Sequence, residues 1–138
     1  MAKEEADLIC SVYLVGEQGV SKTELLSQFS DTKIFNLGGQ SPTCATFIRK
    51  KLYFSEEKKS IAFDIWDTAG QRKYFGVTKI SLKSAKVCIL VYDITNQESF
   101  DGLKNFWYPE IKNIVPKETS KKNILLIILY YSFCINRK

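Results

Sequence analysis

The sequence contains no histidine, so a zinc site could be built only if all of its cysteines came together. The four cysteines are far apart in the chain, at Cys10, Cys44, Cys88 and Cys134. Cys10 and Cys88 lie inside apolar runs, and their simplest interpretation is as small core residues in a reducing compartment.

The chain also lacks long hydrophobic runs. No stretch of about eighteen apolar residues predicts a membrane span, and residues 1–5 lack the apolar core of a signal peptide. We therefore expect a cytoplasmic protein. A hydrophobic content of 45% in 138 residues suits one globular domain with one core. The net charge of +5 is scattered along the chain, which favours solvated surface over a nucleic-acid interface.

Apolar runs alternate with helical patterns, which predicts an α/β fold with a mainly parallel sheet. The expected strands are residues 8–15, 46–54, 60–67, 86–92 and 124–129, and the expected helices are residues 22–29 and 97–115. The second and third strands should form an antiparallel hairpin. The continuous apolar run of the last strand is typical of a central strand covered on both faces.

The second predicted helix carries its own boundary signals. Thr95 or Asn96 is expected to cap its start. Pro109 is expected to break or kink it, because proline lacks the backbone N–H and crowds the preceding turn. The segment Asn36–Ser41, which contains two adjacent glycines, is expected to be an exposed loop.

Two segments carry residue types that handle phosphate. Gly16–Thr23 (GEQGVSKT) follows an apolar run and opens the first helix, where backbone N–H groups and the helix N-terminus can hold a polyphosphate. Asp67–Gln71 (DTAGQ) follows a second apolar run and places a carboxylate at a strand's C-terminal end. A Mg²⁺ ion that bridges phosphate oxygens needs a hydroxyl and an acid, which Thr23 and Asp67 supply.

Ordinary structural roles explain each of these segments when it is taken alone. Lys22 and Thr23 are also suitable residues for a helix start, and Asp67 is also suitable as an acid at a strand end. These interpretations weaken when both segments occur in this order, each after an apolar run. The pair therefore favours a nucleoside triphosphatase.

The segments VGEQGVSKT (15–23), IWDTAGQ (65–71) and ILVYDITNQESF (89–100) resemble small GTPases of the Ras superfamily, most closely the Rab branch. The resemblance covers residues 8–129, whereas WYPEI (107–111) is more similar to the Rho branch. It implies a P-loop NTPase three-layer fold. Residues 1–138 would form a single incomplete GTPase domain without the last strand and helix, and residues 130–138 an atypical tail.

The resemblance also implies a role for each matched residue. Nucleotide binding would fall to Gly16, Glu17, Gln18, Gly19, Val20, Ser21, Lys22, Thr23, Thr43, Asp67 and Gly70. The Mg²⁺ ligands would be Thr23, Thr43 and Asp67. Gln71 would be the catalytic residue that orients the attacking water. Pro42-Thr43 matches the family's first switch loop, whose threonine closes over Mg²⁺ when triphosphate is bound. Loss of the γ-phosphate would remove the contacts that order both switch loops of the family.

The implied function is that of a Rab-like switch, which binds GTP or GDP with Mg²⁺ and hydrolyses GTP in vesicle transport. Its partners would be exchange, activating and effector proteins, bound near residues 36–47 and 66–82. The alternative is a non-catalytic pseudo-GTPase that serves as an interaction module. A P-loop ATPase or kinase is disfavoured, because DTAGQ together with Pro42-Thr43 fits the switch proteins.

Several positions depart from the family pattern near the phosphates. Ser21 replaces a glycine that lets the backbone approach phosphate closely, so we expect a strained loop or a weaker cradle. Gln18 replaces a small residue, and its long side chain is expected to slow hydrolysis. The first switch is one residue short between Thr43 and Phe47, and an alignment through Phe47 places Pro42 at the metal position.

Further departures affect partners and the base. Phe47 and Trp66 match two of the three aromatic residues that bind partners, and Ser81 occupies the third place. Residues 130–133 stand where the family reads guanine with Asn-Lys-x-Asp. Cys134 is too far from the chain end for a C-a-a-X lipid anchor. The chain as written is expected to be weakly stable and aggregation-prone, because an apolar edge and face would be bare.

Overall fold

The computed structural model describes residues 5–30, 47–114 and 125–130. In chain order its elements are β1 (Leu8–Val15), α1 (Lys22–Phe29), β2 (Phe47–Phe54), β3 (Lys59–Asp67), the 3-10 helix η1 (Arg72–Tyr74), α2 (Phe75–Leu82), β4 (Val87–Asp93), α3 (Gln97–Gly102), the π-helix η2 (Leu103–Trp107), α4 (Tyr108–Ile114) and β5 (Leu125–Tyr130). The predicted loop at Asn36–Ser41, the pair Pro42-Thr43, Cys44 and Cys134 lie outside the described residues.

The strands form one sheet in the order β2-β3-β1-β4-β5. β2 is antiparallel to β3, and the other pairings are parallel, which confirms the predicted α/β fold and its hairpin. Leu14 near the end of β1 pairs with Asp67 at the end of β3. The loops that follow these two strands therefore emerge at the same edge of the sheet.

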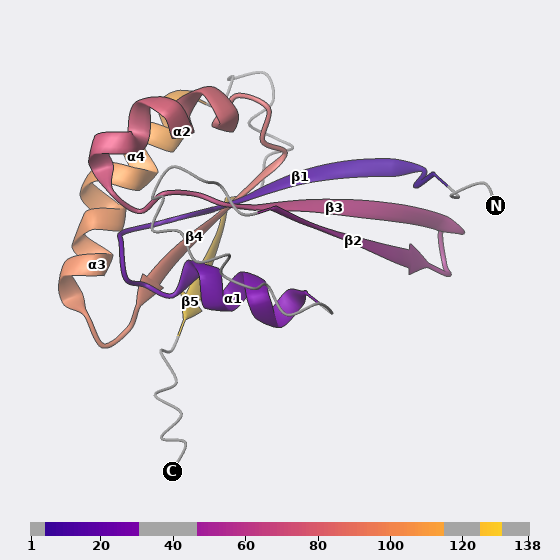
Figure 1. The fold of residues 1–138 in the computed structure, drawn as a ribbon, viewed down its shortest axis with the longest axis horizontal. Coiled ribbons are helices and arrows are strands. Elements are labelled where there is room, and N and C mark those ends of the chain that lie inside the picture. The colour runs from indigo at the N-terminus through magenta and orange to yellow at the C-terminus, as the bar shows by residue number, and fades with distance from the viewer. Residues whose placement is uncertain (1–4, 31–46, 115–124, 131–138) are drawn as a thin grey trace, which may run out of the picture.

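Helices cover both faces of the sheet. α2, α3 and α4 lie on one side and α1 lies on the other (Figure 1). Because side chains alternate along a strand, Tyr13 and Val15 of β1 pack in the core under α2 to α4, and Leu14 packs with Leu26 of α1. Cys88 is buried in the same core as Tyr13 and Val15, as predicted, and Cys10 is partly buried on β1.

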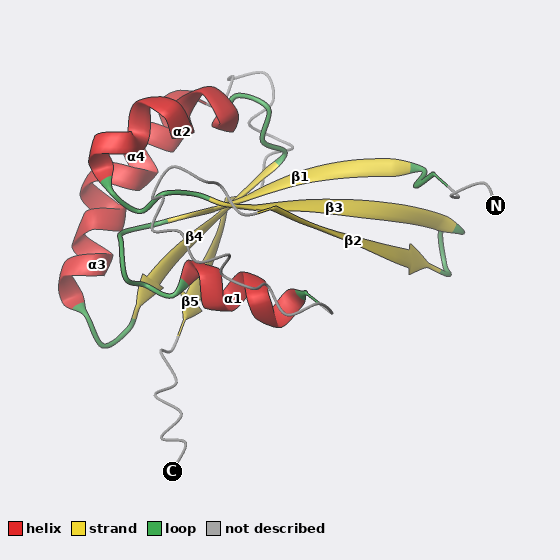
Figure 2. Ribbon diagram, in the orientation of Figure 1, coloured by secondary structure: helices red, strands yellow, loops and turns green. Residues whose placement is uncertain are grey.

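Most predicted elements have the observed boundaries to within a residue or two, but α2 was not predicted. Figure 2 shows it as a helix that follows the DTAGQ segment. Phe75 and Leu82 are buried in this helix, whereas Val77 and Ile80 on its outer side are 64% and 70% exposed. Apolar residues on both sides remove the amphipathic period by which a helix is recognised in a sequence.

The helix at residues 97–114 is not broken at Pro109. Asn96 caps it by accepting a hydrogen bond from the backbone N–H of Glu98 at 3.0 Å. The π-helical turn Leu103–Trp107 then precedes Pro109, which lies in the first turn of α4. A missing N–H is tolerated at the N-terminal positions of a helix, so the helical segment continues past the proline.

The run that forms β5 is typical of a central strand, but in this chain it was expected to lie at a bare apolar edge of the sheet. Among the described strands it is the last in the sheet order and pairs with β4. A continuous apolar run therefore identified a strand here but not its place in the sheet. In the described ranges, no helix combines the length and apolar character that a membrane crossing requires.

Candidate nucleotide site

The loop between β1 and α1 is shaped by small residues and unusual backbone angles. A β-carbon at Gly16 would overlap the backbone oxygen of Val91 on β4, so only glycine fits there. Gly19 has a φ of 83°. Ser21 has a φ of 65° and a ψ of 35°, the left-handed conformation that costs a residue with a β-carbon about 1–2 kcal/mol. The strain expected in this loop therefore lies in the left-handed backbone of Ser21.

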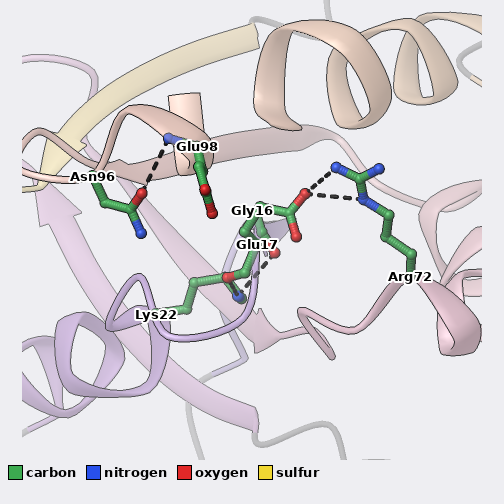
Figure 3. Close-up of polar contacts among 6 residues, drawn as sticks. All are labelled: Gly16, Glu17, Lys22, Arg72, Asn96 and Glu98. Carbon is green, nitrogen blue, oxygen red and sulfur yellow. Dashed lines mark hydrogen bonds and ion pairs between the residues drawn. The ribbon is translucent and has the colours of Figure 1, made fainter. Parts of the chain in front are cut away.

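Lys22 lies at the start of α1 and turns its side chain back over this loop. It is only 6% exposed, and its Nζ donates to the backbone oxygens of Gly16 at 3.0 Å and Glu17 at 2.8 Å (Figure 3). Burial lowers the pKa of Lys22 to about 8, although the nearby carboxylates, Asp67 first, act in the opposite direction. A buried ammonium in this position is suited to an anionic ligand, whose charge would replace the lost solvation.

Thr23 and Asp67 connect the loop to β3. The hydroxyl of Thr23 donates to Asp67 Oδ2 at 2.5 Å. Asp67 Oδ1 is buried and makes no hydrogen bond within the described residues. Burial raises the pKa of Asp67, and the Thr23 hydroxyl and the Lys22 charge oppose that rise. A buried carboxylate oxygen without a partner is costly, so this oxygen is suited to a cation or a hydrogen-bond donor.

These two side chains fit a hard divalent cation. Mg²⁺ takes oxygen ligands and is usually held by one or two protein groups together with phosphate oxygens and water. The hydroxyl of Thr23 and the carboxylate of Asp67 supply oxygen atoms side by side, one of them with no partner in the described part of the chain. Thr43, the third predicted ligand, lies outside that part.

The DTAGQ segment packs directly against the loop Gly16–Thr23, the candidate phosphate-binding loop. Thr68 donates its hydroxyl to the backbone oxygen of Leu14 at 2.6 Å, which ties the end of β3 to β1. A β-carbon at Gly70 would lie 2.6 Å from the backbone nitrogen of Gln18. Gln71 precedes η1, and its backbone oxygen accepts from the N–H of Tyr74 at 3.0 Å.

The structure places Gly70 and Asp67 against the loop between β1 and α1, whereas Gln71 is placed beside that loop only through its neighbour Gly70. The remaining loop residues differ in their surroundings: Gln18 is exposed, whereas Val20 is 2% exposed and anchors the loop in the α1 core. Sequence reasoning missed Arg72, which donates from Nη2 and Nε to Glu17 Oε1 at 2.5 and 3.0 Å (Figure 3). The signal in the sequence was the charge of Arg72, which follows the DTAGQ segment directly and is opposite to the charge of Glu17.

Comparison with known proteins shows the family to which the chain belongs. The sequence model of the Ras family matches residues 11–129. The chain is 35% identical over 112 residues to the Ras-related protein RABA1c of Arabidopsis thaliana, covering 81% of this chain and 50% of that protein. It is 34% identical over 113 residues to the Ras-related protein Rab-21 of Geodia cydonium, covering 82% and 48%. The chain belongs to the Ras superfamily of small GTPases, in the Rab branch.

A third relative of this Rab-branch protein comes from Schizosaccharomyces pombe. The GTP-binding protein ypt3 of Schizosaccharomyces pombe is 32% identical over 127 residues, which cover 92% of this chain and 55% of ypt3. The chain thus spans about half the length of the curated relatives it matches. The matched region contains the segments Gly16–Thr23 and Asp67–Gln71, on which the candidate site is built.

Proposed function

We propose that this Rab-branch protein binds GTP and GDP together with Mg²⁺ and hydrolyses GTP slowly, as a switch in vesicle transport. The observation that carries the proposal is the contact of Thr23 with Asp67 at 2.5 Å, which leaves the other oxygen of Asp67 buried and unpaired within the described residues. This pair lies at the edge of the sheet where the phosphate-binding loop begins a helix, beside the buried ammonium of Lys22.

The phosphates would lie in the loop Gly16–Thr23. The backbone N–H groups of its residues and the first turn of α1 would bind the phosphate oxygens. Lys22 would neutralise the β- and γ-phosphates. Its burial supports this role, because a buried ammonium strongly prefers an anionic partner. Gly70 would present its backbone N–H to the γ-phosphate, a role supported by its close approach to Gln18 and Lys22.

The metal would be held by Thr23 and Asp67, and Thr43 stays an expected third ligand. When bound, Mg²⁺ would offset charge on the β- and γ-phosphate oxygens. Gln71 would orient the attacking water, and the reaction would depend on positioning and charge stabilisation. Its location directly after Gly70 supports this assignment.

Hydrolysis by this chain is expected to be slow for two reasons. The left-handed backbone of Ser21 places strain in the phosphate-binding loop. Gln18 carries a long side chain, and Gly70, the proposed γ-phosphate contact, lies against the backbone of Gln18. Selectivity for guanine is also expected to be weakened, because residues 130–133 stand in place of the family's Asn-Lys-x-Asp motif.

Partner proteins would bind the face formed by β2, β3 and α2. The rings of Phe47 and Trp66 lie 4.6 Å apart between centroids, and Phe47 is 41% exposed. A cavity of about 250 Å³ lies beside them, lined partly by Trp66, Tyr74 and Val77. Exposed apolar side chains around a cavity support a protein-binding surface for effectors and regulators.

The second candidate is a pseudo-GTPase that presents this surface without nucleotide chemistry. Two observations favour it: the strained Ser21, and the engagement of the Lys22 ammonium by carbonyl groups of its own loop. A fluorescent-nucleotide titration separates the candidates. Tight binding of GTP that depends on Mg²⁺ supports the switch, binding of ATP and GTP alike indicates recognition of phosphate alone, and absence of binding supports the pseudo-GTPase.

The matched variant for this titration is Lys22→Ala, which should abolish binding. Unchanged affinity in Lys22→Ala would refute the assignment of the phosphate-binding loop. Thermal unfolding of the variant, measured in parallel, separates loss of the ligand site from loss of the fold.

A further inference from the structure

Arg72 connects three separate parts of the molecule. Its guanidinium donates twice to one carboxylate oxygen of Glu17 in the phosphate-binding loop, from Nε at 3.0 Å and from Nη2 at 2.5 Å (Figure 3). The same guanidinium carbon lies 4.6 Å from the ring centroid of Phe106. An arginine that is both paired with a carboxylate and placed over an aromatic ring is restricted in position more than an ion pair alone would restrict it.

The ring of Phe106 is itself held in place. It makes edge-to-face contacts with Phe75 of α2 and with Trp107, which is fully buried. Phe106 and Trp107 are the last two residues of the π-helical turn, and such turns are frequent at functional sites. The ring over which Arg72 lies is therefore held by contacts with two buried core side chains.

Glu17 is also seated by a specific neighbour. A β-carbon at Gly102, the last residue of α3, would overlap Glu17 Oε1 and would lie 2.9 Å from Glu17 Cδ. The absence of a side chain at Gly102 is thus what allows the Glu17 carboxylate to lie where Arg72 reaches it. We call the set Glu17, Arg72, Gly102 and Phe106 the Arg72 clamp.

We propose that Arg72 is a positioning residue for Gln71, which holds the segment after Gly70 against the phosphate-binding loop through the Arg72 clamp. Gln71 is adjacent to Arg72 in the chain, and Glu17 is adjacent to Gln18. The clamp consequently fixes the separation between the proposed water-orienting side chain and the phosphate cradle. This inference rests on the proposed GTPase function for its catalytic consequence, but the clamp itself is a property of the protein without nucleotide.

The first test is Arg72→Ala. Single-turnover GTP hydrolysis should slow by about fivefold to tenfold, the size of one partly exposed ion pair combined with one cation–π contact. The Kd for GDP should change by less than about twofold, because Arg72 contacts the loop through a side chain and the phosphates bind its backbone. Arg72→Lys should recover only part of the rate, since lysine lacks the two-donor geometry.

The second test changes no residue of the phosphate-binding loop and leaves Arg72 in place. Gly102→Ala should displace the Glu17 carboxylate and slow hydrolysis to a similar degree. The melting temperature should change little, because the helix propensity of alanine offsets part of the cost of adding a methyl group at this buried position. In the double variant Gly102→Ala with Arg72→Ala the two effects should not add, because both remove the same contact.

The control is Arg49→Ala. Arg49 makes a comparable two-donor pair with Asp64 on the β2–β3 hairpin, where its side chain is 54% exposed against 50% for Arg72. This variant should leave the hydrolysis rate and the GDP affinity unchanged.

Hydrogen exchange separates failure of the clamp from failure of the proposed function. In the nucleotide-free protein, backbone amides of residues 71–74 should exchange faster in Arg72→Ala and Gly102→Ala than in the wild type or Arg49→Ala. Equal exchange in all four proteins would overturn the clamp whether or not the protein binds nucleotide. Faster exchange with an unchanged hydrolysis rate would refute the positioning of Gln71 alone, and faster exchange in a protein that binds no nucleotide would refute the GTPase proposal alone.

Discussion

Gly70 lies against Lys22 so closely that a β-carbon at position 70 would be 2.7 Å from the ammonium nitrogen. The same β-carbon would be 2.7 Å from the Cα of Gln18, which belongs to the opposite side of the phosphate-binding loop. The contact joins segments about fifty residues apart in the chain. It makes position 70 a sensitive probe of whether the two segments act together.

Gly70→Ala should weaken nucleotide binding by at least about tenfold, since a backbone atom of Gln18 must move to admit a methyl group. Isothermal titration with GDP and Mg²⁺ measures this change. Gly76→Ala is the matched control, because no atom lies within 4 Å of a β-carbon at Gly76. That variant should bind normally and gain about 0.5–1 kcal/mol of stability from helix propensity. Equal affinities in the two variants would argue against the close packing of Gly70.

Asp67→Asn tests the proposed metal site. The amide keeps the shape of the side chain and an acceptor for the Thr23 hydroxyl, but it removes the charge that Mg²⁺ requires. Addition of Mg²⁺ should tighten GDP binding at least tenfold in the wild type and by less than about twofold in the variant. The free variant should melt no lower than the wild type, because burial already disfavours the Asp67 charge, as its raised pKa indicates. Asp64→Asn, at the acid that pairs with Arg49 on the β2–β3 hairpin, serves as the control for the metal response.

The pH dependence of binding should report the protonation of Lys22. Because burial lowers its pKa to about 8, the free protein increasingly holds a neutral amine above that pH, and nucleotide affinity should fall as pH rises through about 8. Lys22→Met should bind no nucleotide at any pH in this range, as expected for Lys22→Ala. A flat affinity between pH 7 and 9 in the wild type would contradict the assigned role of Lys22.

Lys22 should have the opposite pH dependence in the stability of the ligand-free protein, which should rise with pH while nucleotide affinity falls. Between about 8 and the ordinary lysine value of 10.5, the unfolded chain binds a proton at Lys22 that the folded chain does not. The contribution of Lys22 to the free energy of unfolding therefore rises with pH across this window. Denaturant titrations of the wild type and Lys22→Met at several pH values measure the difference.

Ser21→Gly should relieve the left-handed backbone of the phosphate-binding loop. The gain from removing the β-carbon, about 1–2 kcal/mol, exceeds the entropic cost of glycine, about 0.5–1 kcal/mol. The variant should therefore be slightly more stable than the wild type and should bind GDP more tightly. Ser27→Gly in the regular part of α1 should be destabilising instead, which makes it a suitable comparison. Thermal unfolding with and without GDP distinguishes these outcomes.

Local patterns were sufficient to predict most of the fold. The strand at Leu8–Val15 and the helix at Lys22–Phe29 have the predicted boundaries, because apolar runs and helical spacing are properties of neighbouring residues. α2 was not predictable in this way, since Val77 and Ile80 are exposed on a helix whose other side is buried. The π-helical turn before Pro109 was not predictable either, because it depends on how that turn packs in the core.

The sequence by itself determined the family, the phosphate-handling residue types and their order along the chain, because these reside in short motifs. Only the tertiary structure decided which of them meet. The parallel pairing of β1 with β3 places Leu14 beside Asp67, and from that register follow the contact of Thr23 with Asp67 and the reach of Arg72 to Glu17. Contacts between distant residues depend on how strands pair and helices pack, and no local pattern of residues records that.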